Sequence, residues 1–110
     1  MREEHDRPAD PVTNRADVLL RLRSGSEGIR RQGVRRLGLF GSFARDEAQP
    51  ESDVDLLVEF EPGAKSFRSF MRTAFLLEEL LGREVELVTP ESLSPHMRDG
   101  IVRSAVYVEP

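Results

Sequence analysis

The stretch that decides the fold is GLFGSFARDEAQPESDVDLLVEF, which covers residues 38–60. One apolar run in it ends at Gly41-Ser42, and a second begins with two aspartates, Asp53 and Asp55. This pattern is typical of two strands joined by a tight turn and a polar loop. Ionised carboxylates are costly at the start of a buried strand, because they lose their hydration there. We therefore expect a positively charged group to lie opposite these two aspartates.

The two aspartates share one face of the second strand, because residues two apart in a strand point to the same side. Their Cα atoms are then roughly 6.6 Å apart. The opposite, buried face is expected to carry Val54, Leu56, Val58 and Phe60. Two converging carboxylates repel each other unless a divalent cation neutralises them, and Mg²⁺ suits such hard oxygen ligands. Taken alone, an Asp-x-Asp pair is more often a solvated strand end than a metal site.

The Gly41-Ser42 turn supplies the complementary half of such a site. A glycine directly after a strand lets the backbone approach a ligand closely. The next helical turn starts here, and free N–H groups at a helix start bind phosphate, with the Ser42 hydroxyl as a further donor. A phosphate chain held at this turn, and joined through Mg²⁺ to Asp53 and Asp55, would form a site for phosphoryl or nucleotidyl transfer.

A third carboxylate is offered by Glu86 in the run EVELV. Glu86 alternates with Val85 and Leu87, so it points away from the face that these two bury. If this strand lies beside the strand of the two aspartates, the three acids meet on one surface of the sheet. Three such acids are the minimum for a two-metal site, in which the metals hold the attacking and leaving oxygens in line. In isolation, Glu86 would be an ordinary surface residue.

The rest of the sequence predicts alternating helices and strands, which indicates an α/β or α+β fold with a small sheet flanked by helices. Charge, two prolines and a lack of periodicity predict that residues 1–13 form a disordered tail, followed by one domain over 14–110. The expected elements of this domain are helices over 14–32, 66–81 and 94–103, a helical turn over 42–48, strands over 34–40, 53–60 and 83–89, and an extended segment over 105–109.

The helix over 66–81 carries the clearest apolar face, and Ser66 is expected to cap its start. The apolar stripe consists of Phe67, Phe70, Met71, Ala74, Leu77 and Leu81. Leu76 and Leu80 lie outside this stripe, either as ordinary surface leucines or as part of a partner contact. In the last helix, Met97 and Ile101 are expected to face inward.

Composition restricts the class of protein. With 110 residues, the chain has the length of one domain. It contains no cysteine, which excludes disulfides and thiolate metal sites and makes the cytoplasm the expected location. No apolar run approaches the ~20 residues of a membrane span, so we expect no membrane association. The net charge of −4 argues against direct nucleic-acid binding, which usually requires a basic excess.

The conjunction of these features resembles a known family. Gly41-Ser42, ten further residues and then Asp53-Val54-Asp55 reproduce the G-S-x10-D-x-D signature of the DNA polymerase β-like nucleotidyltransferase superfamily. The flanking text GVRRLGLFGSFAR, SDVDLLVEF, LLGREVELVTPESL and IVRSAVYVEP is similar to its minimal, MNT-type members. The resemblance implies the nucleotidyltransferase fold, with a mixed sheet in three layers. It also implies Mg²⁺-dependent transfer of a nucleotide, usually AMP from ATP.

The resemblance also implies roles for the site residues. Gly41 and Ser42 would hold the triphosphate, while Asp53 and Asp55 would ligate the metals of a two-metal site. Glu86 takes the place of the third catalytic and metal-binding acid, where the family most often has aspartate.

Two charged residues follow the turn. Arg45 lies one turn on, where it is expected either to contact a phosphate of the nucleotide or to pair with Glu47 or Asp53. Asp46 stands where the family commonly has glycine after the arginine, and it adds negative charge near the proposed phosphate site.

Minimal members of this family are similar to antitoxins paired with HEPN-domain partners, typically ribonuclease toxins, and some silence the toxin by transferring AMP to one of its tyrosines. Two functions therefore remain open for this chain. The first is an AMP transferase that modifies such a partner, which the intact signature favours. The second is an antitoxin that neutralises its partner by binding alone, which Glu86 and Asp46 favour. A transferase for a small molecule, such as an antibiotic, ranks third because no acceptor domain is evident.

Overall fold

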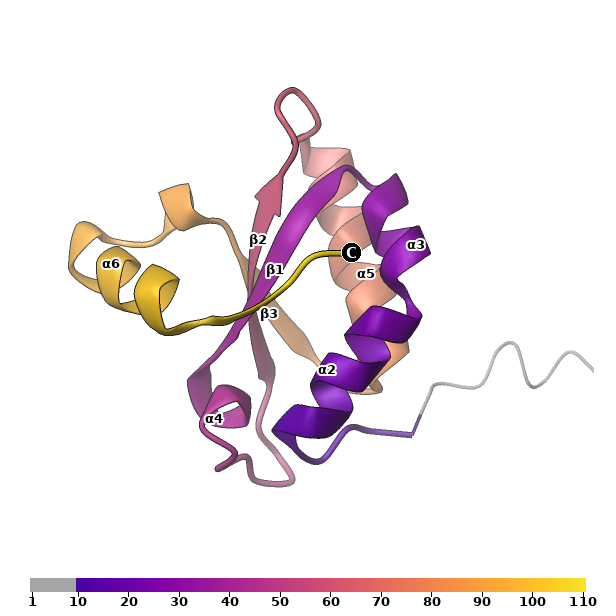
Figure 1. Cartoon of the computed structure of the whole chain (residues 1–110), viewed down its shortest axis with the longest axis vertical. Helices are drawn as coiled ribbons and strands as arrows, with labels where there is room; N and C mark the ends of the chain where they lie inside the picture. The colour runs from indigo at the N-terminus through magenta and orange to yellow at the C-terminus, as the bar shows by residue number, and fades with distance from the viewer. Residues whose placement is uncertain (1–9) are drawn as a thin grey trace, which may run out of the picture.

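A computed structural model describes residues 10–110, which fold around a four-stranded sheet (Figure 1). In chain order the strands are β1 (Val34–Phe40), β2 (Val54–Phe60), β3 (Val85–Val88) and β4 (Val106–Val108). Across the sheet they are ordered β3-β2-β1-β4. β1 pairs antiparallel with both β2 and β4, while β2 pairs in parallel with β3. The small mixed sheet expected from the sequence is confirmed.

Helices lie on both sides of this sheet. α2 (Arg15–Ser24), α3 (Ser26–Arg31) and α5 (Phe67–Leu81) cover one face, while the 3-10 turn η1 (Pro90–Ser92) and α6 (Pro95–Ser104) lie on the other side (Figure 1). The single turn α4 (Gly41–Ala44) follows β1. Because β1 runs opposite to β2 and β3, the α4 turn and the starts of β2 and β3 share one end of the sheet.

One apolar cluster lies between the sheet and helices α2, α3 and α5. Its buried members are Val12, Val18, Leu22, Ile29, Val34, Leu37, Leu39, Phe43, Val54, Leu56, Val58, Leu77, Leu81 and Val108. β2 contributes Val54, Leu56 and Val58, each 0% exposed, on the face that the alternation predicts. Burial of such side chains stabilises the fold by about 1.5–3 kcal/mol each. Leu57, on the opposite face of β2, is also buried.

The helix expected over residues 14–32 is two helices in the structure, and the break at Gly25 corrects that prediction. A Cβ atom on Gly25 would lie 2.5 Å from Cδ1 of Leu80 on α5. The α2–α3 junction therefore lies close against Leu80, whose side chain would have to shift to make room for a Cβ atom at residue 25. The predicted cap at Ser66 is confirmed, since its side chain accepts a backbone hydrogen bond from the first turn of α5. The side chain of Asn14 caps α2 in the same way.

Several apolar side chains lie differently from the prediction. Leu76 and Leu80 are partly buried and pack against the core, with Leu76 beside Gly28, so they are not ordinary surface leucines. A partner contact at their exposed atoms stays a prediction. Phe67 is 82% exposed and Met97 is 54% exposed, so neither faces the core. The buried residues of α5 are Thr73, Leu77 and Leu81. Because α5 packs against α2 and α3 as well as the sheet, its buried side is turned away from Phe67.

Residues 10–13 belong to the folded domain, which corrects the predicted extent of the tail. Val12 is 0% exposed, and its N–H donates to the carbonyl of Leu81 at 3.0 Å. A single buried valine after two polar stretches leaves no periodicity, so the sequence pattern did not indicate its burial. The remainder of the predicted tail, residues 1–9, lies outside the described residues.

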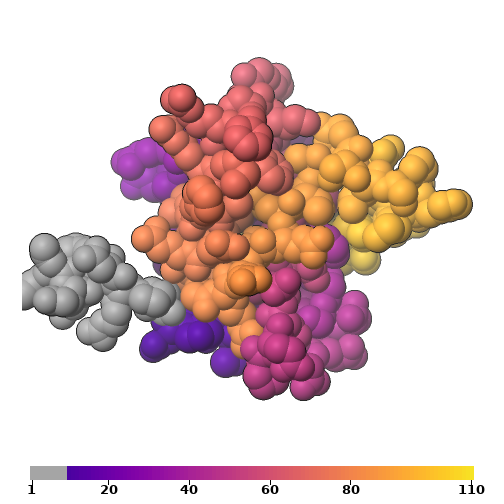
Figure 2. All heavy atoms as spheres, turned by 180° about the vertical axis from the view of Figure 1, so that it is seen from behind, coloured from indigo at the N-terminus to yellow at the C-terminus, as the bar shows by residue number. Residues whose placement is uncertain are grey.

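Helix α5 lies at the surface on the side of the molecule shown in Figure 2, with the segment 82–88 below it. Phe75 on this helix is 62% exposed. None of the helices within residues 10–110 is long and apolar enough to cross a membrane.

Candidate active site

The candidate site lies at the end of the sheet where β1 ends and β2 and β3 begin. The strand register places Asp55 of β2 directly beside Phe40 of β1 and Glu86 of β3. Asp53 precedes β2 by one residue and is exposed. This pairing confirms that Glu86 lies beside Asp55, while the roles of the three acids stay predictions.

Asp55 is half buried and surrounded by negative charge. Burial raises the pKa of its carboxyl, and the charges of Glu86 and Asp53 raise that pKa further, whereas Arg45 lowers it. The metal-free site therefore carries an excess of negative charge, which a hard divalent cation such as Mg²⁺ would neutralise. Within residues 10–110, no group of three or more histidine, aspartate and glutamate side chains is arranged to hold a metal ion. The acids adjoin one another without converging on one point.

Gly41 joins the turn that the sequence predicts to hold phosphate to this acidic surface. Its φ of +76° lies in the left-handed region, from which the α4 turn starts. A Cβ atom at this position would overlap the carboxylate of Asp55. Glycine is therefore needed twice, for its backbone conformation and for its lack of a side chain. Ser42 follows as the second residue of α4, where helix N–H groups have no intrahelical partner.

Arg45, which follows α4, pairs with Glu47 through Nε and Oε1 at 3.1 Å. Of the two acids predicted to pair with Arg45, Glu47 and Asp53, the structure shows Glu47. Both side chains are mostly exposed, and an exposed pair contributes only about 0–1 kcal/mol. Arg45 also lines, with Arg15, a pocket of about 330 Å³ beside Gly41. If Arg45 paired with a phosphate group in place of Glu47, the loss of the Glu47 ion pair would therefore cost little free energy.

Asp46 has a structural role at the start of α2. Its φ of 60° is left-handed, a conformation that aspartate tolerates and that glycine adopts without strain. The carboxylate accepts a hydrogen bond from the backbone N–H of Arg15, the first residue of α2, at 2.9 Å. The negative charge of Asp46, which follows the predicted phosphate-binding turn, is thus engaged at the positive end of α2.

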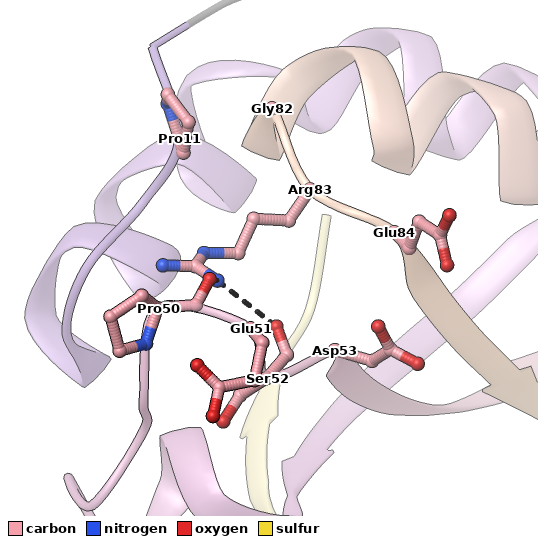
Figure 3. Close-up of a pocket in the computed structure, with 8 residues that line it drawn as sticks. All are labelled: Pro11, Pro50, Glu51, Ser52, Asp53, Gly82, Arg83 and Glu84. Carbon is pink, nitrogen blue, oxygen red and sulfur yellow. Dashed lines mark hydrogen bonds between the residues drawn. The ribbon is translucent and has the colours of Figure 1, made fainter.

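Arg83 lies beside the candidate site, and it was not among the residues predicted from the sequence. It reaches across a pocket of about 570 Å³ whose lining includes Asp53 (Figure 3). Nη1 donates to the carbonyl oxygens of Pro50 at 2.7 Å and Ser52 at 3.0 Å. Nε donates to the carbonyl oxygen of Val12 at 2.6 Å. The carboxylate of Asp53 lies on the side of the pocket away from the guanidinium (Figure 3).

No sequence signal marks Arg83 as special. It follows the glycine that ends α5 and precedes a strand, a position where a charged residue is usually solvated. Its partners are backbone carbonyls, which every residue carries, so no side-chain pattern indicates them. The only hint is the proline-containing loop before β2, whose carbonyls need donors from elsewhere.

Comparisons of sequence place the chain among known enzymes. A family model described as the nucleotidyltransferase domain matches residues 22–108. Protein adenylyltransferase MntA of Thermococcus cleftensis is 45% identical over 78 residues, which cover 71% of this chain and 78% of that protein. MJ0435 of Methanocaldococcus jannaschii, assigned as a protein adenylyltransferase, is also 45% identical over 78 residues, which cover 71% of this chain and 83% of that protein.

Comparisons of structure agree with these matches. A solved structure assigned as a minimal nucleotidyltransferase is 39% identical, with a TM-score of 0.67, over 80% of this chain and 93% of that chain. A toxin–antitoxin crystal structure with AMP-PNP is 21% identical, with a TM-score of 0.59, over 86% of this chain and 71% of that chain. The mixed sheet with its helices is therefore the nucleotidyltransferase fold that the resemblance implied.

Proposed function

Since the chain belongs to the nucleotidyltransferase domain family, we propose that it transfers AMP from ATP, with Mg²⁺, to a tyrosine of a HEPN-type partner toxin and so neutralises it. The relatives named protein adenylyltransferase support a protein as the acceptor. The toxin–antitoxin of the same fold, crystallised with AMP-PNP, supports a toxin as the partner and an adenine nucleotide as the substrate.

The observation that carries the proposal is the closeness of Gly41 to Asp55. The turn that would hold the phosphates and the acid that would hold the metal leave no room even for a Cβ atom between them. A triphosphate bound here would contact the N–H groups of the turn and the metal-binding acids together. Such simultaneous contact is what nucleotidyl transfer requires, because the reacting phosphate must be oriented and its charge neutralised.

Each site residue then has a defined task. Asp53 and Asp55 would hold Mg²⁺, which supplies positive charge to the phosphates when bound. Ser42 and the N–H groups of α4 orient the triphosphate and hold the pyrophosphate as it leaves. The acceptor hydroxyl oxygen forms a bond to the α-phosphorus while the bond from that phosphorus to the pyrophosphate oxygen breaks. Glu86, beside Asp55, accepts the proton of the hydroxyl.

A second candidate function is an antitoxin that binds its partner without modifying it. Two observations favour this alternative. Glu86 is one methylene longer than the aspartate that the family most often has. In the part of the chain that the structure describes, the acids also do not converge on a single point.

Incubation with labelled ATP, Mg²⁺ and the product of a neighbouring gene separates the two functions. We expect the partner protein to gain the mass of one or more AMP units in its intact mass spectrum. The matched control is a double variant, Asp53→Asn with Asp55→Asn, which keeps the side-chain size and removes both charges. A partner that is inhibited yet unmodified would establish the binding antitoxin instead.

The metal requirement has its own test. ATP should bind only with a divalent cation present, because Asp53 and Asp55 otherwise repel the triphosphate. Calorimetry with Mg²⁺ and with excess EDTA measures both affinities. Equal affinities would remove the metal site from the proposal while leaving protein modification to be judged by mass.

A further inference from the structure

We propose that Arg83 is a positioning residue, whose guanidinium fixes the loop that carries Asp53 against the turn that contains Ser42. The contacts of Arg83 carry the inference that it fixes this loop. The effect of the fixed loop on AMP transfer rests on the proposed function.

The loop before β2 has a defined internal shape. The N–H of Gln49 donates to Oγ of Ser52 at 2.9 Å, and the N–H of Ser52 donates back to the carbonyl of Gln49 at 3.0 Å. Pairing with the β3 side begins only after Asp53, where the N–H of Val54 donates to the carbonyl of Glu84 at 3.0 Å. The internal bonds close the turn, but they do not place it relative to the rest of the domain.

Arg83 places this turn. Its Nη1 donates to the carbonyl oxygens of Pro50 and Ser52, and Ser52 is the residue directly before Asp53. Its Nε donates to the carbonyl oxygen of Val12, so the guanidinium is itself held from another direction. Figure 3 shows the side chain of Arg83 extending from the start of β3 to this loop. The approach to Asp53 is therefore anchored by a side chain from the segment that leads into β3.

The same guanidinium adjoins the phosphate turn. Its central carbon lies 5.1 Å from the ring centre of Phe43, which follows Ser42 and is 0% exposed. Arg83 also stands three residues before Glu86 in the chain. One side chain thus links the three segments that carry the proposed site residues, which are the α4 turn, the loop before β2 and the start of β3.

Arginine suits this position better than lysine does. The guanidinium is planar, its donors point in fixed directions, and it stacks on aromatic rings. A lysine would place one compact charge on a flexible stem, which cannot donate to Val12 and Ser52 from fixed positions while covering Phe43. Arg83→Lys should therefore keep the charge and release the loop.

Arg98 provides a matched control in the same domain. It also binds two carbonyls of a turn, with Nε donating to Pro90 at 2.8 Å and Nη2 donating to Leu93 at 2.9 Å. That turn has its own internal hydrogen bonds, from the N–H groups of Ser92 and Leu93. Arg98 lies on α6, on the side of the sheet away from α2, α3 and α5 (Figure 1).

Amide hydrogen exchange tests the inference without reference to activity. In Arg83→Lys and Arg83→Met, the hydrogen-bonded amides of the 49–54 loop should exchange about 10-fold faster or more, because bonds to a charged donor are lost. The amides of the 89–93 turn should not change. In Arg98→Met the opposite result is expected: the amides of the 89–93 turn should exchange faster, and those of the 49–54 loop should not change. If Arg83→Met fails to fold, Arg83→Lys decides.

Single-turnover transfer of AMP to the partner protein gives the second readout. Arg83→Lys should lower the rate by about 10- to 100-fold, the range found when residues that orient metal ligands are changed. Arg98→Met should leave the rate unchanged at a comparable loss of thermal stability. Guanidinium ion at a non-denaturing concentration should restore part of the rate in Arg83→Met, because it can replace the missing group in the pocket.

Unchanged exchange in the 49–54 loop of both Arg83 variants would overturn the inference. Faster exchange spread evenly over the whole domain would overturn it as well, since this would show general destabilisation. A parent protein that transfers no AMP would instead defeat the proposed function. The exchange measurement would then still decide whether Arg83 positions the loop.

Discussion

On the helix-covered face of β2, Val54, Leu56 and Val58 are each 0% exposed, whereas the other face begins with the half-buried carboxylate of Asp55. Burial stabilises the first set of side chains. At Asp55, burial acts against the ionised group and raises its pKa. β2 carries both the buried apolar side chains and the carboxylate of Asp55, because consecutive side chains of a strand point to opposite faces. The strand that anchors the core therefore also positions the site.

The face of β2 that carries Asp55 contains two acids in contrasting surroundings. Glu59 accepts from Nε and Nη2 of Arg36, each at 3.1 Å, and the Arg36 guanidinium lies 4.0 Å from the ring centre of Tyr107. Asp55, four residues earlier, adjoins Glu86 instead. An acid that holds the sheet together is thus neutralised by an arginine of the neighbouring strand. The surroundings of Asp55 favour a cation supplied from outside the chain.

Truncation of the covered face should have the largest effect. Leu56→Ala removes a side chain that is 0% exposed, so the free energy of unfolding should fall by about 2–5 kcal/mol. Urea denaturation followed by circular dichroism measures this change. The matched control is Leu20→Ala, because Leu20 is 64% exposed and its truncation should change stability by no more than about 0.5 kcal/mol. Equal losses in the two variants would contradict this account of the core.

A change at Glu86, beside Asp55, should act on chemistry rather than on stability. Glu86→Gln keeps the size and removes the charge, so single-turnover AMP transfer should slow by about 10²-fold or more. ATP affinity should change little, because the proposed role of Glu86 is at the attacking hydroxyl and not at the bound triphosphate. Glu86→Asp should retain or raise the rate, since it restores the residue commoner in the family.

The control for this pair is Glu79→Gln, which removes an exposed carboxylate from α5. It should transfer AMP at the parent rate. If Glu86→Gln also transfers as fast as the parent protein, Glu86 is a surface carboxylate and its assignment as the third acid is wrong.

Substitutions of Asp46 test whether its charge acts on α2 alone or also at the proposed phosphate-binding turn. Asp46→Ala loses the hydrogen bond to the N–H of Arg15 and keeps a left-handed backbone, so stability should fall by about 1 kcal/mol, as for a lost helix cap. Asp46→Gly loses the same bond but relieves the strain, so its loss should be smaller. Thermal unfolding measures both changes. Tighter ATP binding in both variants would show that the charge acts at the phosphate turn.

Asp55→Asn should stabilise the metal-free protein, and this change in the free energy of unfolding should be the smallest of the predicted effects. The pKa of Asp55 is raised above its ordinary value of 3.8 in the folded state, first by burial and then by Glu86 and Asp53. The folded protein therefore binds this proton more tightly than the unfolded chain does. The stability that this group contributes is fully present below pH 3.8 and is lost as the pH rises through the folded pKa.

The asparagine variant does not lose this contribution, so its advantage should be absent in acid and present at neutral pH. Thermal unfolding in EDTA over a range of pH values measures the difference. Added Mg²⁺ should then stabilise the parent protein and not the variant, because a ligand that binds only the folded state stabilises that state. A metal-free variant less stable than its parent at neutral pH would contradict the raised pKa.

Parts of the candidate site could be predicted because their signals are local. Gly41 ends one apolar run, and Asp55 alternates with the valines and leucine of the next. The alternation around Glu86 predicted which way it points, but its place opposite Asp55 depends on the parallel register of β2 and β3. Strand order and register are set by contacts between segments that are distant in the chain, so periodicity within one strand does not determine them.

By itself, the sequence determined the features that neighbouring residues set: the faces of the strands, the caps of α2 and α5, and the glycine at the start of α4. Only the tertiary structure decided that α2 and α3 separate at Gly25, that Val12 is buried, and that Arg83 holds the loop before Asp53. Arg83 reaches Ser52 across 31 residues of chain and Val12 across 71. Its acceptors are backbone carbonyls, which are alike in every residue, so only folding selects the ones that it binds.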